Sequence, residues 1–130
     1  MIAFEESKTR INIMRAFAGE SQARNRYTFA AALARQNRLE VVARTFDFTA
    51  GQEKEHAEIF YQFLAPMNGS NILMDAGFPV NTEQNVPAQL RAAVHNETEE
   101  CNTAYPEFSR IAREEGFGRI ADAFAAIATI

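Results

Sequence analysis

Proline and glycine are unevenly distributed along this chain, and their distribution constrains the fold more than any other feature. One stretch of about 66–87 holds three of the four prolines and two glycines: Pro66, Gly69, Gly77, Pro79 and Pro87. On either side of it, apolar residues recur every three to four positions with few interruptions, which is typical of helices. Because proline and glycine end or kink helices, this stretch predicts one long connection between two helical regions.

The two flanking regions predict four helices. We expect the first over about 5–36 and the second over about 39–64, with a turn so short that the two are antiparallel neighbours. A third helical stripe runs over 90–111, where Pro106 should open or kink the helix, and a fourth helix starts at 117. Two helical hairpins and one crossover predict an all-α four-helix bundle, a single domain over 1–130. A composition of 23 Ala against 5 Val also favours helices over strands.

Composition argues against several classes of function. A net charge of −4 argues against a general nucleic-acid binder, whose affinity depends on neutralising phosphates. The chain has no run of 18 apolar residues, so we expect no membrane span. The single cysteine, Cys101, excludes an internal disulfide framework and a metal site built on paired cysteines. One thiol and no signal-like N-terminus favour a reducing, cytoplasmic setting.

Charged residues occupy positions in the apolar stripes where a core is expected. The stripe of the first helix contains Ile13, Phe17, Glu20, Arg24, Tyr27, Ala31 and Ala34. The other candidates are Glu53 and His56 in the second helix, and Glu97 and Glu100 in the third. An isolated buried carboxylate costs several kcal/mol unless it is paired, protonated or bound to a metal. Bound cations would neutralise several glutamates that converge on one layer of the bundle.

The spacing of these residues points to a pair of metal ions. Glu53-x-x-His56 places a carboxylate and an imidazole one helical turn apart on one face. Di-iron and di-manganese bundles use one Glu from each of two helices and a Glu-x-x-His from each of the others. Glu20 and Glu97 fit the single-Glu positions, and Glu100 is an additional candidate. Oxygen ligands with one or two imidazoles suit a pair of iron or manganese ions better than structural zinc.

Tyr27 and Tyr105 each lie one to two turns from a candidate ligand. Two interpretations are open for them. They are ordinary core aromatics, or their hydroxyls donate hydrogen bonds that orient the carboxylates.

At these residues the sequence resembles the rubrerythrins, which are ferritin-like di-iron proteins. The matching segments cover essentially the whole chain: FAGESQARNRYTF, EKEHAEIF, NETEECNTAYPEF and EEGFGRIADAFAAIA. The resemblance implies a ferritin-like fold and a non-haem di-iron peroxidase that reduces hydrogen peroxide to water in oxidative-stress defence. It also implies catalytic iron ligands, with two tyrosines hydrogen-bonded to their carboxylates. The implied ligands are Glu20, Glu53, His56, Glu97 and Glu100, and the tyrosines are Tyr27 and Tyr105.

The sequence differs from the family pattern in two ways, and each difference leads to an expectation. Family members often have a C-terminal rubredoxin domain with two CxxC pairs, whereas this chain has one cysteine, so we expect an external electron donor such as a rubredoxin-like protein. The second Glu-x-x-His of the family does not occur before Ile130. The 33-residue spacing from Glu20 to Glu53, applied from Glu97, reaches position 130, and the apolar stripe of the fourth helix projects to positions 131 and 134, so the missing pair should follow immediately. We therefore expect a truncated fourth helix and an incomplete site.

Three functions remain open at the level of sequence. The leading one is the di-iron peroxidase, and the first alternative is a ferritin-like iron-binding or ferroxidase protein. The third is a metal-free structural oligomer with protonated carboxylates. A short fourth helix would leave apolar faces of the first and third helices uncovered, which predicts a homodimer. The long crossover would also permit the exchange of helical hairpins between protomers.

Overall fold

The computed structural model describes residues 2–129, and within them all regular structure is helical. The main helices are α1 (Lys8–Gln36), α2 (Glu40–Gln62), α3 (Val86–Glu99), α4 (Tyr105–Glu114) and α5 (Gly118–Ala128). Short 3₁₀ turns, η1 (Phe4–Glu6) and η2 (Ala65–Met67), precede α1 and follow α2, and a π-helical segment, η3 (Glu100–Ala104), joins α3 to α4. In this part of the chain, no helix has both the length and the apolar character that a bilayer crossing requires.

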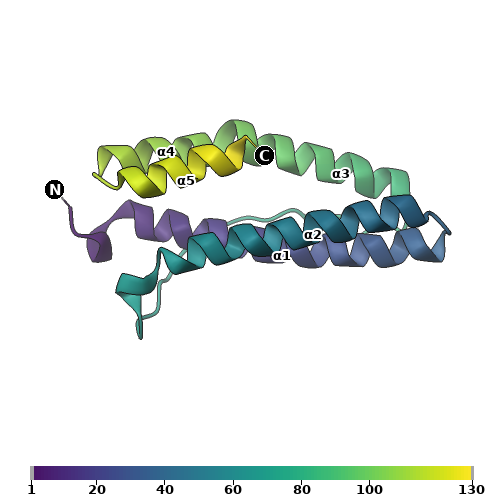
Figure 1. Cartoon of the computed structure of the whole chain (residues 1–130), viewed down its shortest axis with the longest axis horizontal. Helices are drawn as coiled ribbons and strands as arrows, with labels where there is room; N and C mark the ends of the chain where they lie inside the picture. The colour runs from purple at the N-terminus through teal and green to yellow at the C-terminus, as the bar shows by residue number, and fades with distance from the viewer. Residues whose placement is uncertain (1, 130) are drawn as a thin grey trace.

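The helices form two layers (Figure 1). One layer holds α1 and α2, which run antiparallel. In the other layer α3, η3 and α4 follow one another as a single long arm, and α5 folds back beside α4. The irregular crossover returns along the bundle from the end of α2 to the start of α3. The prediction of an all-α four-helix bundle with one long crossover is confirmed.

The turn between α1 and α2 is as short as predicted. Leu39 N–H donates to Ala34 O at 2.9 Å, and this bond closes the end of α1. Arg38 adopts a φ of 60°, in the left-handed region that favours glycine. A tight reversal of this kind holds the two helices side by side, so residues on α1 and α2 can face the same site.

Pro106 opens the third helix rather than ending it, as the sequence predicted. Proline has no N–H to donate and its ring clashes with the preceding turn. The helix widens into the π-helical segment η3 immediately before α4. Tyr105 N–H donates to the carbonyl of Glu100, five residues back. Because Glu100 lies on this π-helical segment, the irregularity changes where its carboxylate points.

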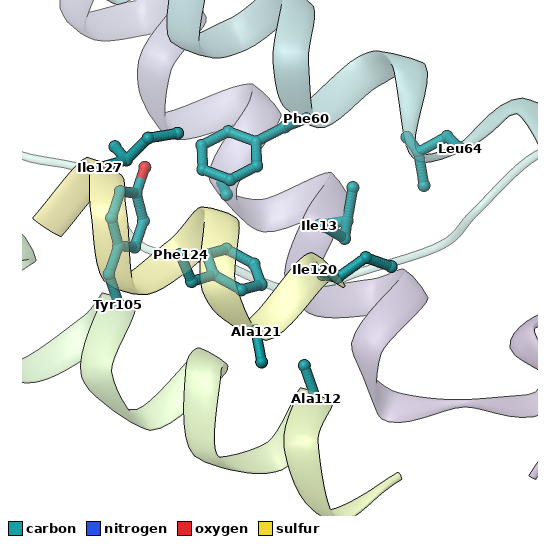
Figure 2. Close-up of a cluster of buried hydrophobic side chains, with 10 residues drawn as sticks. Ile13, Phe60, Leu64, Tyr105, Ala112, Ile120, Ala121, Phe124 and Ile127 are labelled. Atoms are coloured by element: carbon teal, nitrogen blue, oxygen red, sulfur yellow. The ribbon is translucent and has the colours of Figure 1, made fainter. Parts of the chain in front are cut away.

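A core cluster of aromatic and aliphatic residues joins α1, α2, α4 and α5 (Figure 2). Phe124 of α5 lies at its centre, with ring centroids 5.1 Å from Phe60 and 5.6 Å from Tyr105. Figure 2 shows the Tyr105 ring extending from α4 toward the opposite layer. The core therefore fixes the orientation of a tyrosine that also reaches the candidate site.

One part of the predicted core pattern is wrong. Arg24 is exposed and Phe17 is only half-buried, where it stacks on Tyr61 with ring centroids 4.6 Å apart. The buried face of α1 passes instead through small residues, including Ala16, Ala23 and Ala30. Small side chains let neighbouring helices approach closely, and the guanidinium of Arg24 stays in water.

Candidate metal centre

The fold brings all five candidate ligands to one place between α1, α2 and the α3–η3 arm. Glu20, Glu53 and His56 each offer one ligand atom, and these three atoms lie within 4.8 Å of one another. Glu53, Glu97 and Glu100 form a second group with the same spacing. Because Glu53 belongs to both groups, the two potential cation positions are adjacent and share one carboxylate. This is the arrangement expected of a two-metal site.

Two of the carboxylates are buried and incompletely satisfied. Glu20 is 0% exposed and Glu53 is 5% exposed. Among the residues from 2 to 129, neither Glu20 Oε2 nor Glu53 Oε2 has a hydrogen-bond partner. A buried carboxylate oxygen without a partner is costly, whereas a metal ion uses it as a ligand. The donor set, four carboxylates and one imidazole, therefore fits iron or manganese.

The two tyrosines predicted near the ligands are bonded to them. Tyr27 donates from its hydroxyl to Glu97 Oε1, and Tyr105 donates to Glu20 Oε1, both at 2.6 Å. Burial, reinforced by the adjacent glutamates, raises the pKa of both phenols above the usual value. Both hydroxyls therefore remain protonated and act as donors at neutral pH. Of the two interpretations that the sequence left open, the geometry favours donors that orient carboxylates.

The cluster holds protons when no metal neutralises it. Burial, together with the charges of Glu20 and Glu97, raises the pKa of Glu100 to about 8. The neighbouring Glu20 carboxylate, whose Oε2 lies 3.6 Å from His56 Nδ1, raises the pKa of His56 against the opposing effect of burial. Metal binding to such a site releases protons, since carboxylate and imidazole ligands must be deprotonated.

Cys101 lies beside the carboxylates on η3 but differs from them chemically. Burial, and then the charges of Glu97 and Glu100, raise the pKa of its thiol. Within the described residues, the groups whose ligand atoms lie close enough to share a metal ion contain the four glutamates and His56 and do not contain Cys101. The Glu-x-x-His expected at 131 and 134 lies outside the described residues.

The sequence reasoning missed a pocket of about 330 Å³ that reaches the carboxylates from one side. Its lining includes Glu97, Glu100 and Tyr105, together with crossover residues 75–79. The crossover had been interpreted only as a connection. Apolar Phe78 and Pro79 within it were the available signal, but the sequence does not reveal which helix they cover.

Comparison with known proteins finds a family match over nearly the whole chain. The family model described as rubrerythrin matches residues 12–129. Rubrerythrin of Porphyromonas gingivalis is 45% identical over an alignment that covers 95% of this chain and 60% of that protein. Rubrerythrins of Nitratidesulfovibrio vulgaris and Clostridium perfringens are 41% and 39% identical, each covering 98% of this chain and 65% and 66% of the relative. The chain therefore spans slightly less than two thirds of the length of these relatives.

Proposed function

Because this chain belongs to the rubrerythrin family, we propose that it is a non-haem di-iron peroxidase that reduces hydrogen peroxide to water in oxidative-stress defence. The observation that carries the proposal is the pair of overlapping ligand groups that share Glu53. In this proposal residues 1–130 form one domain, and a rubredoxin-like protein in a reducing, cytoplasmic setting supplies the electrons.

Glu20, Glu53, His56, Glu97 and Glu100 would hold the two iron ions, with manganese as the alternative metal. When bound, two ferrous ions supply the two electrons that the reduction of peroxide requires. Tyr105 occupies Glu20 Oε1 and leaves the buried Oε2 available as a ligand atom. Tyr27 restrains Glu97 in the same way through Oε1. Such hydrogen bonds keep ligands in a productive orientation and exclude water from the carboxylate oxygens they occupy.

Proton supply is the second task of the chain's own residues. Reduction of peroxide to two water molecules consumes two protons, and a positioned carboxylic acid is a suitable donor. In the metal-free chain Glu100 holds a proton near neutral pH, because burial and neighbouring carboxylates raise its pKa, and iron binding would release that proton. The two protons that the reduction consumes would therefore come from carboxylic acids near the site that do not bind iron.

A ferritin-like ferroxidase is the alternative function, because it would use the same buried carboxylates. The two functions differ in the oxidant. A peroxidase consumes hydrogen peroxide in preference to oxygen, while a ferroxidase oxidises ferrous iron with oxygen alone. A metal-free structural oligomer would do neither.

The test is anaerobic loading of the purified chain with ferrous iron, followed by rapid mixing with hydrogen peroxide or with oxygen. We expect the chain to bind iron, to be oxidised faster by peroxide than by oxygen, and to turn over when a reduced rubredoxin is added. Glu53→Gln should lose both iron and turnover. Glu58→Gln, on the exposed side of the same helix, is the matched control. Faster oxidation by oxygen would establish the ferroxidase instead, and no bound iron would establish the metal-free alternative.

A further inference from the structure

The pocket beside the carboxylate cluster includes two of the candidate ligands in its lining. It lies between α1 and the α3–η3–α4 arm, and Glu97, Glu100 and Tyr105 line it. Its volume is about 330 Å³. A substrate that reached these carboxylates through the pocket would meet the site at the two ligands contributed by α3 and η3.

By area the lining of the pocket is mostly apolar, although the polar side chains of Arg15, Gln22, Arg26, Asn96 and Glu99 also contribute to it. Ala16, Gly19 and Ala23 line it from α1, and Ala104 and Phe108 line it from the opposite arm. Gly19 gives the crossover room, since a Cβ built there would lie 3.4 Å from Phe78 Cε1. The Phe78 ring therefore packs against α1 at Gly19 and lines the pocket, while the side chain stays 40% exposed.

A single arginine anchors this cover. Arg15 Nη2 contacts Asp75 Oδ1 at 2.7 Å, and Arg15 Nε donates to Asp75 O at 2.9 Å. Arg15 Nη1 also donates to Asn12 Oδ1 at 2.9 Å, which restrains the guanidinium from the α1 side. Binding both the side chain and the backbone of Asp75 keeps the following Phe78 close to α1.

The size and character of the pocket exceed what hydrogen peroxide needs. Hydrogen peroxide is a small polar molecule, and one water occupies only about 30 Å³ in the liquid. Apolar walls contribute nothing to the binding of such a molecule, but they favour a ligand that transfers hydrocarbon surface out of water. A pocket whose lining is mostly apolar by area and includes two candidate ligands fits a substrate with one polar, reducible end and one compact hydrocarbon group.

We propose that this pocket binds the hydrocarbon group of compact organic hydroperoxides and presents their peroxide end to the carboxylate cluster. The inference rests on the proposed peroxidase function and extends its substrates from hydrogen peroxide to alkyl and aryl hydroperoxides. The O–O bond of ROOH breaks, two electrons come from two ferrous ions that become ferric, and two protons are consumed. The products are ROH and water, and the external donor returns the two electrons. The volume of about 330 Å³ matches compact hydrocarbon groups, so long-chain lipid hydroperoxides should be poorer substrates.

Binding is tested apart from catalysis. The probe is 2-phenyl-2-propanol, the alcohol that corresponds to cumene hydroperoxide, titrated into the purified 130-residue chain kept free of paramagnetic iron. Amide NMR shifts should concentrate at Gly19, Gly77 and Phe78. Phe78→Ala should weaken the alcohol's affinity by about five- to tenfold, the usual effect of losing one aromatic contact. Val80→Ala is the matched control, because Val80 is 83% exposed on the same segment and does not line the pocket.

Turnover is then compared for cumene hydroperoxide, hydrogen peroxide and a long-chain lipid hydroperoxide with the iron-loaded chain. We expect Phe78→Ala to lower kcat/KM for cumene hydroperoxide by a similar factor, and Val80→Ala to leave the turnover of both peroxides unchanged. Turnover of hydrogen peroxide without alcohol binding at the pocket overturns this inference and leaves the proposed function standing. Equal turnover of the long-chain hydroperoxide also overturns it. Alcohol binding with turnover of no peroxide overturns the proposed function, and the reduction step falls with it.

Discussion

The hydroxyl of Tyr105 donates a 2.6 Å hydrogen bond to Glu20 Oε1 across the interface between α4 and α1. The same tyrosine ring packs in the aromatic core, with its centroid 5.6 Å from that of Phe60 and 5.6 Å from that of Phe124. Core packing and ligand orientation are therefore properties of one side chain. A change that loosens this part of the core will also release a candidate metal ligand.

Replacing Tyr105 with phenylalanine removes this hydrogen bond and keeps the ring. We expect Tyr105→Phe to weaken iron binding by about 10–100-fold, as is typical when a residue that orients a ligand is lost. Anaerobic ferrous titration measures the effect. Tyr61→Phe is the control, because Tyr61 is 58% exposed and stacks on Phe17 away from the ligands. Equal affinity in the two variants would show that the Tyr105 hydroxyl does not support the site.

Glu53 should have opposite effects on stability and on metal binding. Glu53→Gln removes a buried carboxylate from a crowded carboxylate cluster. We therefore expect the free energy of unfolding of the metal-free chain to rise by about 1 kcal/mol. The same substitution removes the carboxylate shared by both ligand groups, so addition of iron should no longer raise the unfolding temperature. Thermal unfolding with and without metal tests both effects. A metal-free variant less stable than the original chain would contradict the first.

Glu115, the residue that follows α4, caps the start of α1. Its carboxylate accepts from Lys8 N at 2.9 Å and from Thr9 N at 2.8 Å, and it is also bonded to the Thr9 hydroxyl. Burial acts to raise its pKa, but these hydrogen bonds outweigh burial and leave the pKa below its usual value. Stabilisation by Glu115 is therefore complete above the unfolded pKa of about 4.3 and is lost as pH falls through the lower folded pKa.

Glu115→Gln should accordingly lower the free energy of unfolding by about 1 kcal/mol at pH 7, the typical size of a helix N-cap contribution. The difference from the original chain should shrink below about pH 4. Urea unfolding at several pH values measures it. Glu114→Gln is the comparison, since Glu114 forms an exposed pair with Arg110 and should change stability by less than about 1 kcal/mol. A constant difference at all pH values would contradict the cap.

Arg38 is a site for a stabilising substitution. Its φ of 60° is unfavourable for a residue with a Cβ, so Arg38→Gly should raise the free energy of unfolding by about 0.5–1 kcal/mol. Arg44→Gly, in the exposed interior of α2, should instead lower it by about 1 kcal/mol. Chemical denaturation of the two variants distinguishes the effects by their opposite signs. A loss of stability in Arg38→Gly would contradict the assigned turn.

We also predict a homodimer. Large apolar side chains are exposed on α2 and α3, with Val41 72%, Phe48 69% and Val94 68% exposed. A second copy would remove this surface from water. Light scattering at micromolar concentration should give twice the 14.6 kDa mass of one chain. Phe48→Glu should lower the measured mass toward that of a single chain. A monomeric mass for the original chain would contradict the prediction. Exchange of hairpins would appear as mixed dimers that form only after unfolding and refolding of labelled chains.

The local pattern of residues was enough to predict the helices and the candidate ligands. Helical periodicity and the positions of proline depend on neighbours a few residues apart, so the crossover and the opening at Pro106 are visible in the sequence. The same is true of Glu53 and His56, whose spacing along one helix places them on one face. The wrong placement of Arg24 shows the limit of this reasoning, because a stripe does not specify which edge of a helix meets its neighbour.

Contacts between distant residues depended on the tertiary structure. Tyr27 and Glu97 are 70 residues apart, and Tyr105 and Glu20 are 85 apart, so their pairing depends on how the helices rotate and slide against one another. The sequence placed these residues near the site and left the role of the tyrosines undecided. The anchor from Arg15 to Asp75 and the packing of Phe78 on Gly19 gave no periodic signal at all. Helix spacing along the chain determined which residues bear the chemistry, and the packing of the two layers decided which atoms meet, because axial offset and rotation are set by the whole core.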